Sequence, residues 1–378
     1  MTDDTERPKG PTRPRTGMTR RGVLTASAAA ALGPAPALGR DVSATPLHAL
    51  AAGRGLSFGT AVNTNVLTDP SYAALVAREC NVIVAENHFK WGMLRPTPAQ
   101  ADFSVADQIV AFGQSHGMRV RGHTLFFQEA LSAWVPQEIA RTSAERVLED
   151  HIRLVCGHFG RGVSSWDVMN EVVLPEDGRP DGLRRNVFLE AMGPSYVGKA
   201  FWIAREAAPG AELVYNDWIG PYAGRYFETR RARLLQLLEG LVRSGAPVQA
   251  FGVQSHLDAS RDDVDERGWA AFLQRASDLG LRLHLTELDV ADQKLPADPG
   301  TRDRKTADAV RRYLDVTLDN KAVRDLLTWN LSDRYTAVSI YLPRPDGLPP
   351  RSLPYGDGDR PKPMREAIAQ ALVAAPAR

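Results

Sequence analysis

Two glutamates, Glu171 and Glu287, each follow a short apolar run and have other polar residues beside them. Two carboxyl groups that face each other about 5–5.5 Å apart can hydrolyse a glycosidic bond by double displacement. One carboxyl protonates the departing oxygen, and the other attacks the anomeric carbon to form a covalent glycosyl intermediate. The acid must keep its proton near neutral pH, and a nearby carboxylate favours this by raising its pKa. Sequence spacing alone does not decide which glutamate has which role.

Amide, imidazole, carboxylate and indole side chains follow the other apolar runs in the same way. These positions are Glu86–Trp91, His123, Asn170–Glu171, Asn216–Trp218, Gln254–His256, Glu287–Asp289 and Trp329–Asn330. Polar groups at strand ends contribute little to core packing, and in a barrel the carboxyl ends of the strands share one mouth. The alternative, separately satisfied strand-end residues, would have to hold for every one of these positions, so we favour a shared cleft.

Short β-rich runs alternate with amphipathic helical runs along the chain. The expected strands are Leu56–Ala61, Val82–Ala85, Arg119–His123, Ser164–Val168, Glu212–Asn216, Ala250–Val253, Arg282–Thr286 and Leu326–Trp329. The expected helices are Pro70–Glu79, Ala106–His116, Ser143–Phe159, Tyr196–Ala207, Thr229–Ser244, Val264–Asp278, Arg302–Leu318 and Pro363–Val373. Gly117, Gly245 and Gly280 end three of these helices. The alternation predicts an α/β fold, a single (β/α)8 TIM barrel.

The composition is that of an ordinary globular protein, which excludes collagenous, coiled-coil and wholly disordered chains. The 378 residues carry 46 Lys and Arg against 45 Asp and Glu, a net charge of +1, so nothing favours a nucleic-acid partner. Cys80 and Cys156 are too few for a disulfide framework or a Cys-based zinc site, and we expect buried thiols. No apolar run past the N-terminus reaches about 18 residues, so we expect no membrane span. We also expect a monomer, with no metal and no cofactor.

The N-terminal residues resemble an export signal rather than part of a folded domain. Residues 1–17 are polar and rich in Pro and Arg, which predicts a disordered extension, or a start at Met18 instead of Met1. Residues 18–39 carry twin arginines, an Ala-rich apolar stretch and an Ala-Pro-Ala site, as twin-arginine signal peptides do. A linker over 40–50 and a catalytic barrel over 51–375 would follow. An Ala-rich disordered tail is the alternative; a signal would export the protein to the periplasm or outside the cell.

Six blocks in order along residues 55–370 resemble glycoside hydrolase family 10, the endo-1,4-β-xylanases. The blocks are Glu86-Asn87-x-x-Lys90-Trp91, Arg121–Leu125, Trp166–Glu171, Tyr215–Asp217, Gly252–Leu257 and Thr286–Val290, followed by Pro361-Lys362-Pro363. The resemblance implies that Glu171 is the general acid/base and Glu287 the nucleophile. It also implies that Gln254 lies close to the acid/base, while His256 contacts the nucleophile with Asp289 behind it.

The resemblance further implies a xylan-like polysaccharide or oligosaccharide substrate. The residues that would bind hydroxyls in the −2 and −1 subsites are Glu86, Asn87, Lys90 and His123. Asn170 would bind the 2-OH of the −1 sugar, an interaction that strengthens in the transition state. Trp329 would form the apolar floor under that sugar.

Three positions depart from the family pattern. Phe127-Gln128 replaces Trp-His, Asn330 replaces the Gly after Trp329, and Ala337 replaces a second tryptophan. One indole over the −1 site is therefore lost and another is smaller. The space gained beside C5 of the sugar makes a hexose or branched substrate conceivable.

Three other functions compete with a retaining endo-1,4-β-xylanase. The first is a related β-glycosidase with another sugar preference, and the second is an idle sugar-binding homologue. Retention of both glutamates and of the His256–Asp289 pair argues against an idle protein. The third is a metal-dependent hydrolase that would use His123, His256 and Asp289 as ligands, which the order of the motifs does not suggest.

The remaining aromatic and titratable residues have structural interpretations. We expect Trp166, Trp202 and Trp269 to pack in the core, and His88 to lie at the surface. The structural histidines are His116, His151, His158 and His284. Trp91 fits either a subsite edge or packing, and Asp217 fits an indirect role behind the site.

Overall fold

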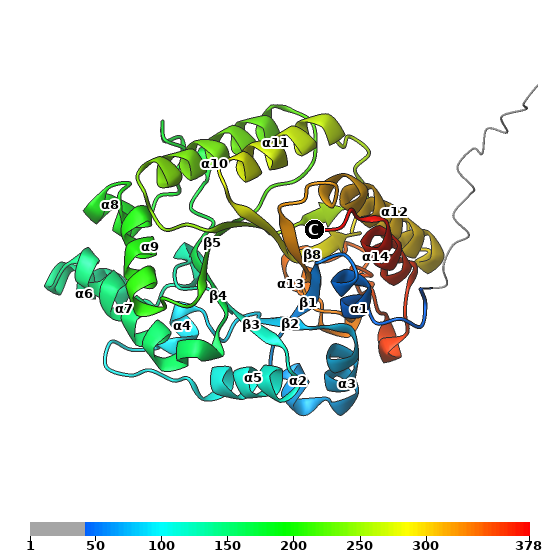
Figure 1. Cartoon of the computed structure of the whole chain (residues 1–378), viewed down its shortest axis with the longest axis horizontal. Helices are drawn as coiled ribbons and strands as arrows, with labels where there is room; N and C mark the ends of the chain where they lie inside the picture. Colours follow the sequence, from blue (N-terminus) through cyan, green and yellow to red (C-terminus); the bar gives the residue numbers. More distant parts are fainter. Residues whose placement is uncertain (1–41) are drawn as a thin grey trace, which may run out of the picture. The chain divides into compact units, whose positions relative to one another are not determined.

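The computed structural model describes residues 42–378, which form one compact unit (Figure 1). The expected extension over 1–17 and signal peptide over 18–39 lie outside the described residues. The strands are β1 (Ser57–Val62), β2 (Val82–Ala85), β3 (Arg119–His123), β4 (Ser165–Asn170), β5 (Glu212–Asp217), β6 (Ala250–Val253), β7 (His256–Asp258), β8 (Arg282–Ala291) and β9 (Val323–Thr328).

Eight of these strands close a parallel barrel, as predicted. Neighbours pair in the order β1-β2-β3-β4-β5-β6-β8-β9, and the parallel pairing of β9 with β1 closes the ring. In the view of Figure 1 the strands surround the centre and the helices lie outside them. The strands β2, β4 and β6 are buried along their whole length. A strand covered on both faces reads as a continuous apolar run, which is why the sequence pattern located β2 and β6.

Eight longer helices return the chain from one strand to the next. They are α3 (Pro70–Glu79), α5 (Ser104–Ser115), α7 (Ala144–Phe159), α9 (Tyr196–Ala207), α10 (Arg225–Arg243), α11 (Glu266–Asp278), α12 (Pro299–Thr317) and α14 (Pro363–Ala374). The shorter helices are α1 (Leu47–Ala52), α2 (Asn65–Thr68), α4 (Trp91–Leu94), α6 (Val135–Arg141), α8 (Val187–Met192) and α13 (Val338–Tyr341), with the 3-10 turn η1 at Gln128–Ala130. The punctuating residues Gly117, Gly245 and Gly280 have φ of 66°, 75° and 83°, a left-handed conformation that favours glycine.

The short strand β7 is absent from the sequence prediction. It pairs with the carboxyl-terminal half of β8, where His256 lies opposite Asp289. The pairing of β8 with β9 shifts register between Leu285 and Leu288, so β8 continues to Ala291, beyond the expected end at Thr286. Beyond the register shift, β8 carries the buried polar residue Asp289 between the core residues Leu288 and Val290.

The segment expected as a linker differs from its prediction over the residues that are described. Leu47 in α1 is fully buried, and its backbone N–H donates to Glu79 Oε2 over 2.9 Å. The Arg365 guanidinium in α14 donates to the carbonyl of Val42 over 2.8 Å. Residues 42–50 therefore pack against the barrel, because their apolar side chains and backbone groups find partners there.

The burial of the tryptophans agrees with the sequence prediction except at one position. Trp166 and Trp269 are buried as expected, but Trp202 is 51% exposed, so its prediction as a core residue is wrong. Helix α9 buries a stripe that contains Tyr196, Ala200 and Ala204, and Trp202 lies off this stripe. Cys80 and Cys156 are free and buried. Among the helices within residues 42–378, none is long and apolar enough to cross a membrane.

Candidate active site

Glu171 follows the last residue of β4 and has a backbone φ of 53°, in the left-handed region. Its side chain is 22% exposed. Oε1 accepts a hydrogen bond from Gln254 Nε2 over 3.0 Å, and Oε2 accepts one from Arg184 Nη2 over 3.0 Å. Burial raises the pKa of Glu171, and the charge of Asp217 adds to the rise. The surroundings of Glu171 therefore favour the protonated form of its carboxyl group.

Glu287 in β8 is buried and has the opposite tendency. Oε1 accepts from Asn216 Nδ2 over 2.8 Å, and Oε2 lies 3.4 Å from His256 Nε2. Burial alone would raise the pKa, but the hydrogen bond from His256, the charge of His123 and the amide of Asn216 together lower it to about 2. This carboxylate stays ionised, the form that a nucleophile needs.

His256 is held between two carboxylates. Its Nδ1 lies 2.8 Å from Asp289 Oδ1, and the β7–β8 register places the two residues opposite each other. Burial would lower the pKa of His256, but the charge of Asp289 outweighs it and the pKa is raised well above its usual value. The imidazole is therefore a cation beside Glu287 and stabilises its ionised form.

A chain of side-chain amides connects the two glutamates. Asn170 Oδ1 accepts from Asn216 Nδ2 over 2.8 Å and from Gln254 Nε2 over 3.3 Å. The same two amides donate to Glu287 and Glu171 respectively. Asn170 thus uses its carbonyl oxygen within the protein, and among the described residues its amide nitrogen, a donor, has no hydrogen-bond partner.

His123 lies at the carboxyl end of β3, beside the tryptophan that follows β9. His123 Nδ1 is 2.9 Å from Asp167 Oδ2, and Arg121 Nη2 donates to the other oxygen of Asp167 over 2.7 Å. The ring centroids of His123 and Trp329 are 5.5 Å apart, edge to face. Trp329 is 6% exposed, so most of the indole is covered by other residues.

Glu86 and Lys90 line the neighbouring part of the barrel mouth. Glu86 Oε2 accepts from Asn63 Nδ2 and from Asn330 Nδ2, each over 3.0 Å. Lys90 Nζ donates to Asn87 Oδ1 over 3.0 Å, and burial lowers the pKa of Lys90. Hydrogen bonds and ion pairs thus connect Glu171, Glu287, Asn170, Gln254, His256 and Asp289 in one cluster, with Asn216 bridging Asn170 and Glu287. His123 contacts Trp329, and Lys90 contacts Asn87.

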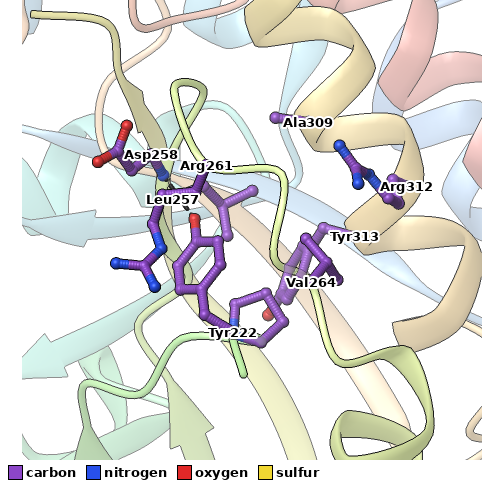
Figure 2. Close-up of a pocket in the computed structure, with 9 residues that line it drawn as sticks. Tyr222, Leu257, Asp258, Arg261, Val264, Ala309, Arg312 and Tyr313 are labelled. Carbon is purple, nitrogen blue, oxygen red and sulfur yellow. Dashed lines mark hydrogen bonds between the residues drawn. The ribbon is translucent and has the colours of Figure 1, made fainter. Parts of the chain in front are cut away.

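Two other observations concern metals and cavities. Within residues 42–378, no group of three His, Cys, Asp or Glu side chains is arranged to hold a metal ion. A small cavity of about 10 Å³ lies between Tyr222, Arg261 and Tyr313, and neither glutamate lines it (Figure 2). That volume holds at most about one water molecule, so it is not a sugar site.

Comparison with known proteins decides the family. The model of glycosyl hydrolase family 10 matches residues 46–371. This chain belongs to glycosyl hydrolase family 10. It is 30% identical over 331 residues to endo-1,4-beta-xylanase B of Thermotoga neapolitana, which covers 86% of this chain and 91% of the relative.

Other members of family 10 agree. Endo-1,4-beta-xylanase B of Paenibacillus barcinonensis is 31% identical, over 77% of this chain and 89% of the relative. The crystal structure of native xylanase 10B from Thermotoga maritima superposes with a TM-score of 0.77 at 30% identity, covering 87% of this chain and 98% of that one. The chain is therefore a glycoside hydrolase.

Three contacts of this family 10 chain involve residues to which the sequence analysis gave no role. Asn216 bonds Glu287, Arg184 bonds Glu171, and Asn330 bonds Glu86. Asn216 stands in a recognised block, which was a usable signal. Arg184 lies 13 residues beyond Glu171 in an irregular segment and has no sequence signal. Asn330, named both among the strand-end residues and as a departure from the family pattern, has a φ of 77°, which asparagine tolerates better than most residues.

The residues with structural interpretations mostly lie outside the cleft. Trp91 is 1% exposed and stacks on His151 with ring centroids 3.6 Å apart, so Trp91 is a packing residue. Asp217 is buried and accepts from Arg230 Nη2 over 2.8 Å, consistent with an indirect role. His284 is buried between Glu212 and Asp325, whereas His116 and His158 are exposed and His88 is half-buried.

Proposed function

We propose that this chain is a retaining endo-1,4-β-xylanase with Glu171 as general acid/base and Glu287 as nucleophile. The observation that carries the proposal is the opposite proton affinity of the two carboxyls, which are connected by one chain of amides. Environment raises the pKa of Glu171 and lowers that of Glu287. A pair of titratable groups pushed apart in this way supports an assignment of acid and base.

In the first step, a Glu287 carboxylate oxygen attacks the anomeric carbon while the bond from that carbon to the glycosidic oxygen breaks. The proton of Glu171 passes to the departing oxygen. In the second step, ionised Glu171 takes a proton from water, whose oxygen displaces Glu287 from the anomeric carbon. The sugar leaves with its original configuration, and both carboxyls return to their starting forms.

The surrounding residues support the charge changes of these steps. Positively charged His256, held by Asp289, keeps Glu287 ionised for the attack. The free amide of Asn170 is suited to the 2-OH of the −1 sugar, and the open surface of Trp329 to its ring. Glu86, Asn87, Lys90 and His123 are suited to further hydroxyls in the −1 and −2 subsites. The proposed chemistry uses carboxyls alone, and the proposed substrate is xylan or a xylo-oligosaccharide.

Product analysis on glucuronoarabinoxylan tests the proposal. We expect the mature protein to release short xylo-oligosaccharides, with Glu287→Ala as the inactive control. NMR of the first-formed product should show the β-anomer, as retention requires. An α-anomer would contradict Glu287 as nucleophile. Binding of xylan without any turnover would instead indicate the idle sugar-binding homologue.

A broader sugar preference is a second candidate, favoured by the departures from the family pattern. Ala337 is 3% exposed and shares a small apolar cluster with Trp329, while the ring of Phe127 lies 6.0 Å from Lys90 Nζ. We expect kcat/KM for an aryl β-cellobioside within roughly tenfold of that for the xylobioside, because the smaller side chains of Phe127 and Ala337 would leave room for the C5 hydroxymethyl group. That is less than the discrimination of about 10–200-fold that a pocket can obtain from even one methylene. A clear preference for the xylobioside and for unbranched xylan would contradict this candidate.

Export and oligomeric state are separate proposals. We propose that the twin arginines direct export of a monomer to the periplasm or outside the cell. Replacing Arg20 and Arg21 by lysine should retain the protein in the cytosolic fraction, whereas unchanged fractionation would reject the signal. Light scattering of the mature chain tests the monomer.

A further inference from the structure

Arg184 lies between the candidate acid/base and a second carboxylate. Its Nη2 donates to Glu171 Oε2 over 3.0 Å, and its Nη1 pairs with Glu129 Oε1. The Arg184 side chain is 12% exposed, whereas that of Glu129 is 63% exposed. The three residues thus form a carboxylate–guanidinium–carboxylate chain that runs from the cleft towards solvent.

The backbone on both sides of this chain is fixed. The backbone N–H of Arg184 donates to the carbonyl of Val172 over 2.7 Å, and Val173 pairs with Leu183 in an isolated bridge. Glu129 lies in η1, directly after Phe127-Gln128, where this chain departs from the family pattern. The Arg184 guanidinium therefore reaches Glu171 from a segment that is hydrogen-bonded to the residues following β4. Its other partner, Glu129, follows the two residues at which this chain departs from the family pattern.

The carboxylates around Glu171 shift its pKa upwards, against the effect of Arg184. The carboxylates of Asp217 and Glu287 raise its pKa, as burial does, whereas Arg184 lowers it. Lys90 and the phenol of Tyr341 also lie within the electrostatic reach of Glu171. The amide of Gln254, the remaining hydrogen-bond partner of Glu171, is neutral, and its hydrogen bond also lowers the pKa of Glu171. Arg184 is the cation in direct contact with the carboxyl, so it is the charged group whose contact favours the ionised form.

We propose that Arg184 and Glu129 are positioning residues that hold the Glu171 carboxyl and balance its acid and base forms during turnover. This inference rests on the proposed function. Arg184 fixes one oxygen of Glu171 and favours the carboxylate that the second step needs. Glu129 fixes the guanidinium and moderates its charge, so that Glu171 still carries a proton for the first step.

Two variants that should shift the alkaline limb of the pH–rate profile in opposite directions test the proposal. The probe is kcat/KM for an aryl β-xylobioside with a poor leaving group, whose alkaline limb reports the acid. Arg184→Gln should move this limb upwards by about one pH unit, because a neighbouring cation is lost. Glu129→Gln should move it downwards, because the charge of Arg184 is then unopposed. Arg184→Lys keeps the charge but loses the planar guanidinium. Compared with Arg184→Gln, it should return the limb part of the way to its wild-type position.

A double variant separates positioning from a distant charge effect. If Glu129 acts through Arg184, Glu129→Gln should have little effect in the Arg184→Gln background. Glu138→Gln is the matched control: it removes a half-buried carboxylate that pairs with Arg141 and has no bond to Glu171. It should leave the profile unchanged.

Two different outcomes overturn two different statements. Shifts of both single variants in the same direction, unmoved limbs, or fully additive shifts would overturn the positioning role. A Glu171→Gln variant that keeps full activity on the same substrate would instead overturn the proposed function. Glu129→Gln changes an exposed side chain, so it keeps the test informative even if Arg184→Gln does not fold.

Discussion

Asn216 Nδ2 lies 2.8 Å from Glu287 Oε1, so a neutral amide in β5 donates to the carboxylate in β8. The same nitrogen donates to Asn170 Oδ1 over 2.8 Å, and Asn216 Oδ1 accepts from the Thr286 hydroxyl over 2.8 Å. All of these groups are buried. One side chain therefore orients the proposed nucleophile and the amide proposed to bind the 2-OH.

Asn216→Leu should move the acid limb of kcat/KM upwards by about one pH unit. The sign follows because Glu287 must be ionised, and loss of a donor raises its pKa above the wild-type value of about 2. The control is Thr286→Val, which breaks the bond between Thr286 and Asn216 but leaves the Asn216–Glu287 contact. Both variants should lower the free energy of unfolding by about 1–3 kcal/mol, but only Asn216→Leu should move the limb.

Glu171→Gln should slow hydrolysis of xylobiosides with poor leaving groups by about 10²–10⁴-fold. Substrates whose leaving group needs no proton should lose far less in the first step, because Glu171 supplies only the proton there. Pre-steady-state kinetics with two aryl xylobiosides of different leaving-group pKa checks this. Equal losses for both would mean that Glu171 is not the acid.

Asp289→Asn should shift the alkaline limb of the pH–activity profile to lower pH. Asp289 raises the pKa of His256, so its loss returns that pKa towards the ordinary value of about 6.5. Above the new value the imidazole is neutral and no longer stabilises ionised Glu287. The pH profile together with direct titration of His256 by NMR measures both effects, and an unchanged His256 titration would contradict the prediction.

Asn330→Gly restores the residue usual in the family and removes a donor to Glu86. Because Glu86 is proposed to bind sugar hydroxyls away from the reacting bond, KM should rise by about 3–10-fold while kcat changes little. Glycine accepts the φ of 77° without strain, so the fold should persist. A fall in kcat at constant KM would show that Asn330 affects the chemical step instead. Isothermal titration with xylotriose on a Glu287→Ala background checks the binding effect directly.

The fold was predictable because barrel strands and helices are local patterns. The strands β2, β3 and β6 have the bounds that the sequence predicts. Of these, β2 and β6 are short apolar runs, which read as buried strands in any context. The polar residues at the carboxyl-terminal parts of the predicted strands, among them Glu171 after β4 and Glu287 within β8, were predictable for the same reason. Parallel strands place their carboxyl ends at one mouth, so the topology alone gathers them.

The sequence by itself determined the residue types of the candidate site, its side of the barrel and the family pattern. Only the tertiary structure decided which side chains touch: Gln254 and Glu171 are 83 residues apart, and Asn216 and Glu287 are 71 apart. The same holds for the bond of Arg184 to Glu171 and for the exposure of Trp202. Hydrogen bonds and burial depend on distances of a few tenths of an ångström and on side-chain direction across the barrel. Those quantities arise from packing the whole chain, and no local pattern carries them.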